Sequence, residues 1–95
     1  MDSFLDEPMP LEPDLDLTPR LGHAVYRQIA PRLVSLGMLK RIDQLAFSVW
    51  CTLATQVRDL KRTGVESILI NELEKWREEL LIPKEIQDAV INDEL

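Results

Sequence analysis

Two stretches of the chain carry apolar residues at every third or fourth position, and a glycine separates them. The first stretch runs from Leu21 to Leu36 and the second from Ile42 to Leu60, with Gly37 between them. This period places the apolar side chains of each stretch on one face of an α-helix. Because such a face must be buried against another element, the two helices are expected to pack on each other. The short connection predicts a helical hairpin.

We therefore predict an all-α protein whose core is a hairpin of helices over residues 19–36 and 42–63. Thr18 and Pro19 favour the start of the first helix, because a threonine oxygen can cap free amide groups and proline suits the first helical position. Gly37 predicts the end of this helix, because glycine readily adopts the left-handed conformation of a helix cap.

The C-terminal segment predicts one or two further helices. Apolar residues at helical spacing predict a helix over residues 67–81, in which Trp76 should belong to the core. Pro83 then opens a short fourth helix. Trp50 and Cys51 lie within the apolar run of the second hairpin helix, and both are interpreted as buried packing residues. Cys51 is the only cysteine, so no internal disulfide is expected.

The net charge of −6 hides a strong segregation of charge along the chain. Residues 1–17 hold six acids and no base, residues 18–63 hold eight bases and two acids, and residues 64–95 hold nine acids and three bases. We therefore divide the chain into a flexible acidic arm (1–17), a basic helical-hairpin core (18–63) and acidic C-terminal helices (64–95). Prolines and like charges disfavour independent folding of the arm.

The basic middle segment is a candidate phosphate-binding surface, because a partner meets local surface charge and not the average charge of the chain. Arg20, His23 and Arg27 are spaced to lie on one face of the first helix, away from its apolar stripe. An ordinary solvated helix surface would carry similar residues, and bases in the last turn of the second helix also complement its dipole. The predicted DNA-binding residues are Arg20, His23, Arg27, Lys40, Arg41, Arg58, Lys61 and Arg62.

The sequence offers no constellation for catalysis or for metal binding. One histidine and one cysteine cannot assemble a catalytic triad or a Cys/His metal site, and no glycine-rich phosphate loop is present. We predict that the chain is not an enzyme and has no catalytic residue, metal site or cofactor. His23 is interpreted as a surface residue. The lack of a long apolar run and of a targeting segment predicts a soluble cytoplasmic protein that does not enter a membrane.

A string of short motifs runs through the hairpin. It consists of Leu17-Thr-Pro19, Tyr26-Arg-Gln-Ile-Ala-Pro-Arg-Leu33, Leu36-Gly-Met-Leu39, Asp43 and Trp50-Cys51. This string resembles the small subunit of the terminase of tailed bacteriophages, and the resemblance covers roughly residues 17–64, about half of the chain. Gly37 and Asp43 match the family pattern as fold markers, because they suit a helix cap and a helix start.

The resemblance implies a non-catalytic component of the viral DNA-packaging motor. Such subunits commonly form rings, select viral DNA, and regulate the ATPase and nuclease of the large terminase subunit. The implied partners are viral double-stranded DNA, the terminase large subunit and further copies of the chain, in the cytoplasm of a bacterial host cell. The small size of the chain independently favours a homo-oligomer, because small domains often gain stability by association.

Two other function classes are compatible with the sequence. The first is a protein-interaction adaptor or regulator without direct DNA binding, in which the central bases pair with the acidic arm. It predicts no measurable DNA affinity until residues 1–17 are removed. The second is a small helix-turn-helix transcriptional regulator. It is disfavoured because no helix with polar base-reading residues follows a tight turn of the usual form.

Overall fold

The structure is all-α, as the apolar spacing predicts. The computed structural model describes residues 4–61 and 67–94. Its helices are α1 (His23–Ser35), α2 (Gln44–Lys61), α3 (Ser67–Leu80) and α4 (Lys84–Ile91), and its 3-10 turns are η1 (Phe4–Asp6), η2 (Arg20–Gly22) and η3 (Arg41–Asp43). No strand occurs in the described residues, and positions 62 and 63 of the predicted second helix lie outside them.

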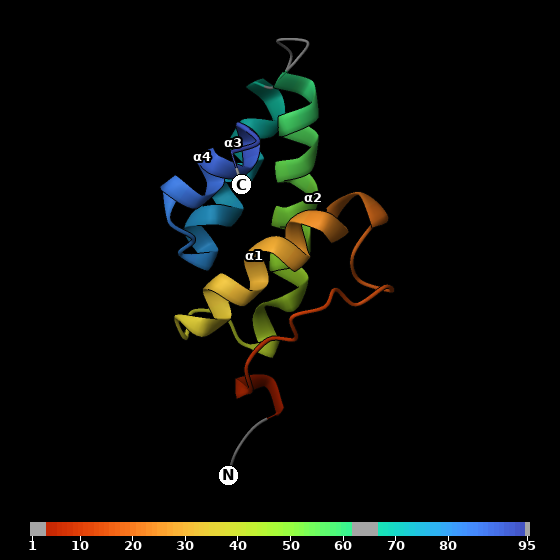
Figure 1. Ribbon diagram of the computed structural model, residues 1–95, viewed down its shortest axis with the longest axis vertical. Helices are drawn as coiled ribbons and strands as arrows, with labels where there is room; N and C mark the ends of the chain where they lie inside the picture. Colours follow the sequence, from red (N-terminus) through yellow and green to blue (C-terminus); the bar gives the residue numbers. More distant parts are fainter. Residues whose placement is uncertain (1–3, 62–66, 95) are drawn as a thin grey trace.

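Helix α2 is the central element of an elongated molecule that measures 49 × 25 × 22 Å. Helix α1 crosses the N-terminal half of α2 obliquely, whereas α3 and α4 lie along its C-terminal half (Figure 1). The chain connecting α1 to α2 is short and reverses direction, and we call α1, this connection and α2 the hairpin. Helix α2 packs in addition against α3 and α4, so the core extends beyond the hairpin. The N-terminal segment runs across the lower end of this hairpin (Figure 1).

The corner of the hairpin is built by Gly37. Its φ of 72° is left-handed, as the sequence predicts. The N–H of Gly37 donates to the carbonyl of Val34 at 2.9 Å, and the N–H of Met38 donates to the carbonyl of Leu33 at 3.0 Å. These two bonds satisfy carbonyls that the end of α1 would otherwise leave free, and they form a Schellman motif.

The start of α2 is fixed by Asp43. Its Oδ2 accepts a hydrogen bond from the backbone N–H of Lys40 at 3.0 Å, immediately before the turn η3. A carboxylate at this position satisfies a free amide and interacts favourably with the positive end of the helix dipole. The predicted role of Asp43 at the amino end of the helix is therefore confirmed.

A single apolar core joins the N-terminal segment to all four helices. Tyr26 meets Phe47 edge to face with ring centroids 4.9 Å apart, and Phe47 stacks on Trp50 at 5.8 Å. Aromatic pairs of this geometry add about 0.5–1.5 kcal/mol to the effect of burial. The predicted burial of Trp50 and Cys51 is confirmed. Burial also raises the pKa of the Cys51 thiol well above its ordinary value.

The apolar period predicts burial for a few residues at helix ends that are exposed in the structure. Leu21, Leu36 and Ile42 are 43%, 66% and 63% exposed, although their spacing predicts that they join the buried stripe. Leu21 and Ile42 lie in 3-10 turns and Leu36 lies at the cap of α1, so the 3.6-residue period does not apply to them. Trp76 is only half-buried and packs at the edge of the core.

The N-terminal segment is packed against the helices over residues 4–17, where the sequence predicts a flexible arm. Met9 is 2% exposed and belongs to the core. Its N–H donates to the carbonyl of Leu39 at 3.3 Å, and the hydroxyl of Tyr26 donates to the carbonyl of Pro10 at 2.8 Å. The charges of the segment favour flexibility, but its acids stay at the surface. The buried side chain of Met9 and several backbone groups make the contact with the helices.

The turn η2 approaches α2 closely at Gly22. A Cβ atom at this position would lie 2.7 Å from Oγ1 of Thr52 and 3.1 Å from its backbone nitrogen. Nearby, the buried hydroxyl groups of Thr18 and Ser48 share a hydrogen bond of 2.7 Å. The absence of a side chain at Gly22 thus lets the start of α1 rest directly on the backbone of α2, and this contact sets where the cations of η2 and α1 lie.

Candidate nucleic-acid interface

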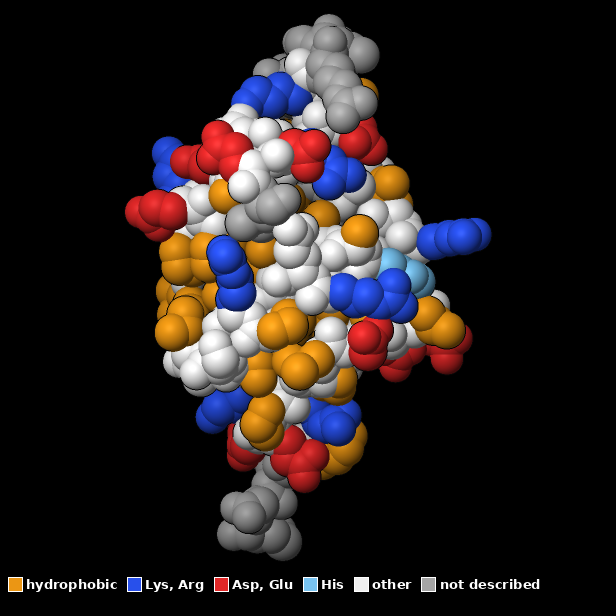
Figure 2. All heavy atoms as spheres, in the orientation of Figure 1, with side chains coloured by type: hydrophobic (Ala, Val, Ile, Leu, Met, Phe, Trp, Pro, Cys, Tyr) orange, Lys and Arg blue, Asp and Glu red, His pale blue; other side chains and the backbone are white. Residues whose placement is uncertain are grey.

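The first group of predicted DNA-binding residues lies on η2 and α1. Arg20 is exposed, and no ion-pair partner for it is found in residues 4–61 or 67–94. The side chain of Arg27 is 53% exposed. His23 is half-buried, and its Nε2 lies 2.8 Å from the carbonyl oxygen of Thr18. Figure 2 shows the single histidine bordered by Lys or Arg side chains. The two arginines are accessible to a partner, whereas the imidazole is engaged with the backbone.

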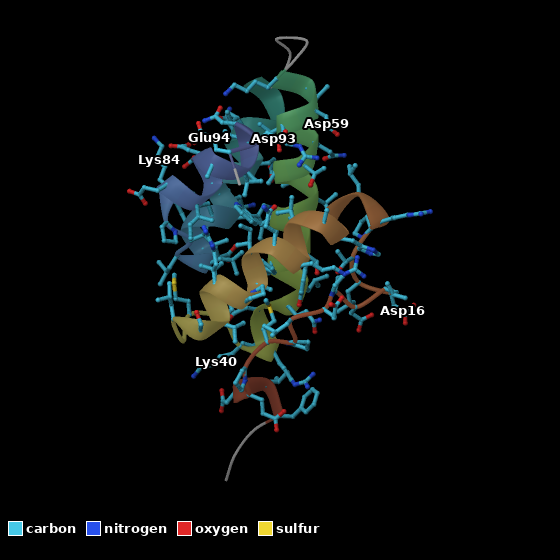
Figure 3. All side chains as sticks on the ribbon, in the orientation of Figure 1. Asp16, Lys40, Asp59, Lys84, Asp93 and Glu94 are labelled. Carbon is cyan, nitrogen blue, oxygen red and sulfur yellow. The ribbon has the colours of Figure 1, made fainter. Side chains whose placement is uncertain are left out.

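The second group lies at the corner between α1 and α2. Lys40 is exposed and marks the lower end of the hairpin in Figure 3. Arg41 is the first residue of η3, and its side chain is 31% exposed. Its guanidinium carbon lies 4.3 Å from the centre of the Phe4 ring, which is a cation–π contact. Lys40 therefore faces solvent, while Arg41 is partly covered by the N-terminal segment.

The third group lies in the last turn of α2, at the other end of the molecule. Arg58 contacts Asp59 at 3.5 Å, and the ammonium of Lys61 donates to the side-chain oxygen of Asn92. Both bases line a hollow of about 220 Å³ that Ile91 also borders. The C-terminal ends of α2 and α4 meet there, and their negative dipole ends disfavour an anion. Arg62 lies outside the described residues.

The seven predicted residues that the structure describes therefore do not form one continuous patch. Helix α2 has 18 residues, which corresponds to a length of about 27 Å, and it separates the corner group from the third group. Figure 3 labels Lys40 and Asp59 near its two ends. On the face shown in Figure 2, the cationic side chains are dispersed among acidic and apolar ones. The groups on η2, α1 and the corner belong to the hairpin and make up the candidate interface.

Two acids of the N-terminal segment contact this candidate interface. Glu12 accepts a hydrogen bond from Nε of Arg27 at 2.6 Å, and Glu7 accepts one from Nε of Arg41 at 3.2 Å. The sequence separations are 15 and 34 residues, so folding alone brings these charges together. Charge segregation along the chain signals that such pairs could form, but it does not identify which acid meets which base.

A polar network between α2 and the helices α3 and α4 was not predicted from the sequence. Trp50 Nε1 donates to Oε1 of Gln87 at 3.0 Å, and Gln87 Nε2 donates to Oε1 of Glu74 at 2.6 Å. Arg77 donates to Glu74 through Nε and Nη2 at 3.0 and 2.8 Å. The hydrogen bond from Arg77 holds the pKa of Glu74 below its usual value. This network connects α2, α3 and α4.

The buried hydroxyl of Tyr26 is a structural group. Burial raises the pKa of Tyr26 to about 12, so the phenol stays protonated at neutral pH. The hydroxyl donates a hydrogen bond to the carbonyl of Pro10 and accepts one from Nε2 of Gln44 at 3.3 Å. Both polar contacts are made within the chain, and they tie α1 to the N-terminal segment and to the start of α2.

Within residues 4–61 and 67–94, no group of three or more His, Cys, Asp or Glu side chains is placed to hold a metal ion. None of the helices in the part of the chain that the structure describes is both long and apolar enough to cross a membrane.

Comparisons with protein-family models, with curated proteins and with solved structures find no match to this chain. Functional inference therefore depends on its own residues and their arrangement.

Proposed function

We propose that this chain is a non-catalytic, oligomeric adaptor that recognises viral DNA and regulates a large terminase subunit during genome packaging. The proposal is carried by one observation: the string of motifs that resembles terminase small subunits coincides with the residues that build the hairpin. Leu33 and Trp50 are fully buried, Gly37 closes the corner, and Asp43 caps the start of α2. The resemblance thus concerns positions that specify this arrangement of helices.

Exposed cations on the hairpin support a role in binding phosphates. Arg20, Arg32 and Lys40 are exposed and have no ion-pair partner among the described residues. A guanidinium or ammonium group without an internal partner can contact a phosphate with little cost of rearrangement. These cations lie on η2, on α1 and at the corner, so the hairpin offers several contacts to a nucleic-acid backbone.

A salt titration of DNA binding tests the proposal. We expect affinity for duplex DNA to fall steeply with salt, with a slope of about −0.9 on logarithmic axes for each contacted phosphate. The double variant Arg20→Ala and Arg27→Ala should weaken binding and reduce the slope by up to about 1.8. Fluorescence anisotropy with a labelled duplex measures both quantities.

The matched control is the double variant Lys75→Ala and Lys84→Ala, which removes the same charge from α3 and α4. It should bind with the slope of the unmodified protein. Equal binding by the Arg20 and Arg27 variant and the unmodified protein would contradict the assigned interface.

Self-association is supported by apolar side chains at the hairpin corner. Leu36, Ile42 and Leu45 are 66%, 63% and 57% exposed. Single exposed leucines are ordinary in soluble proteins, but neighbouring ones favour an interface. Sedimentation equilibrium should give a mass of at least twice the 11.0 kDa of the single chain. A monomer that persists at high protein concentration would contradict the oligomeric part of the proposal.

A protein-interaction adaptor without DNA binding is the second candidate. The contacts of Glu7 with Arg41 and of Glu12 with Arg27 favour it, because the acidic segment pairs with central bases as that hypothesis requires. In the same titration this candidate predicts no DNA affinity for the unmodified protein at any salt concentration. A measurable, salt-dependent affinity would exclude it.

A further inference from the structure

In the folded chain, two of the cations assigned to DNA binding form ion pairs with carboxylates. Glu12 contacts Arg27 at 2.6 Å and Glu7 contacts Arg41 at 3.2 Å. Both acids come from residues 4–17, which we call the acidic strap. A carboxylate and a phosphate oxygen present similar acceptors to a guanidinium group. The strap therefore occupies the same donors that a DNA backbone would use.

The acidic strap is held in place mainly by uncharged contacts. Met9 is buried in the core, and the backbone of Pro8 pairs with that of Lys40 in an isolated bridge. The N–H of Arg41 donates to the carbonyl of Glu7 at 2.9 Å. These contacts anchor the strap across the hairpin corner. A tethered group has a high effective concentration near its partner, so the two acids compete with external anions even though each pair is weak.

The ion pairs themselves are exposed and displaceable. The side chains of Arg27 and Glu12 are 53% and 73% exposed, and those of Arg41 and Glu7 are 31% and 55% exposed. Solvent screening limits the contribution of each surface pair of this kind to a factor of about 1.4 to 5 in an equilibrium constant. A duplex that offers many phosphates can therefore replace them. Pairs of this kind would lower the affinity for phosphates without closing the site permanently.

We propose that the acidic strap is an intramolecular competitor that lowers the affinity of the hairpin for nucleic-acid phosphates through Glu7 and Glu12. The proposal rests on the proposed DNA-binding function and assigns the regulation of that same interface. It predicts that loss of these two acids increases affinity, whereas loss of other acids from the strap has a smaller effect. The position of the removed acids, and not their total charge, then determines the difference in affinity between the variants.

The test compares two double variants of the full chain with equal net charge. Glu7→Gln with Glu12→Gln removes the paired acids. Asp6→Asn with Asp16→Asn removes two acids of the same segment whose side chains form no ion pair with a described residue. Figure 3 shows Asp16 pointing away from the helices. Affinity for a labelled duplex is measured by fluorescence anisotropy at one fixed salt concentration, and circular dichroism checks the fold of each variant.

The paired-acid variant should bind about 2- to 30-fold more tightly than the unmodified protein, as two surface pairs would allow. The Asp6 and Asp16 variant should change affinity less than the paired-acid variant does. Adding Arg27→Ala and Arg41→Ala to the paired-acid variant should abolish the gain, because the freed donors are then absent.

Equal affinity of the two acid variants, with measurable binding by the unmodified protein, would overturn the proposal for the strap and leave the proposed function intact. Absence of DNA binding by the unmodified protein and by every variant would overturn both. Binding by the paired-acid variant alone would support the strap proposal in its strongest form.

Discussion

Two regions pack on α2, namely α1 with the acidic strap and α3 with α4, and they combine charged groups with the fold in different ways. We call these regions the two sides of α2. On the side of α1 and the acidic strap, Arg27 and Glu12 meet at the surface with side chains that are 53% and 73% exposed. On the side of α3 and α4, Arg77 and Glu74 are 18% and 35% exposed, and their hydrogen bonds continue to Gln87 inside the core. Solvent screens the first pair strongly and the second pair much less.

This difference separates charges that are available to a partner from charges that stabilise the fold. The network around Glu74 satisfies the indole N–H of Trp50 through Gln87, so its loss would leave buried polar groups without partners. The pairs of the acidic strap can open without exposing buried groups. We therefore assign binding to the hairpin side and stability to the side of α3 and α4.

The largest expected effect is a loss of stability from variants in the apolar core that the two sides share. Leu33 on α1 and Leu73 on α3 are both fully buried. Leu33→Ala and Leu73→Ala should each lower the free energy of unfolding by about 2–5 kcal/mol, because each leaves a cavity. Urea denaturation measures both. A cost below 1 kcal/mol for only one variant would show that its side of α2 is not part of the common core.

The next effect concerns the network on the side of α3 and α4. Gln87→Leu removes the acceptor of the Trp50 indole and a donor to Glu74, and should lower the free energy of unfolding by about 1–3 kcal/mol. Gln28→Leu, at an exposed position on α1, is the control and should change it by less than about 0.5 kcal/mol. Similar small costs for both variants would contradict a stabilising role for the network.

The third effect is a dependence of stability on pH. The pKa of Glu74 is lowered from 4.5 in the folded chain, chiefly by the hydrogen bond from Arg77. The ionised carboxylate therefore contributes stability above the unfolded pKa, and this contribution is lost as the pH falls through the folded pKa. Glu74→Gln should reduce the loss of stability on acidification below about pH 4.5. Glu79→Gln, on the same helix, provides the comparison in urea denaturation at each pH.

The smallest expected effect is on the hairpin side. Glu7→Gln and Glu12→Gln should each change the free energy of unfolding by no more than about 1 kcal/mol, because exposed ion pairs contribute little. Thermal denaturation at neutral pH measures this. A loss of 2 kcal/mol or more would mean that these acids are structural, and it would remove the distinction between the two sides.

Much of the fold follows from local patterns in the sequence. The apolar period identifies the helices, and Gly37 and Asp43 mark the corner because each satisfies backbone groups within a few residues. The burial of Trp50 and Cys51 follows from their position within an apolar run. These features depend on contacts near in sequence, so sequence reasoning can find them.

The interface and the polar network depend on contacts between distant residues. The docking of Met9 brings Glu7 to Arg41, 34 residues away, and Trp50 finds Gln87 after 37 residues. Composition indicates that acids and bases are segregated, but packing decides which groups meet. The charges of residues 1–17 favour a flexible arm. The burial of Met9 holds this segment against the helices, and the charge pattern does not reveal that contact.

Hydrogen–deuterium exchange with and without duplex DNA tests the central claim most directly, because it reads both sides of α2 in one experiment. We predict slower amide exchange in residues 20–43 on DNA binding and no change in α3 and α4. Protection confined to α3 and α4, or no change anywhere at saturating DNA, would contradict it.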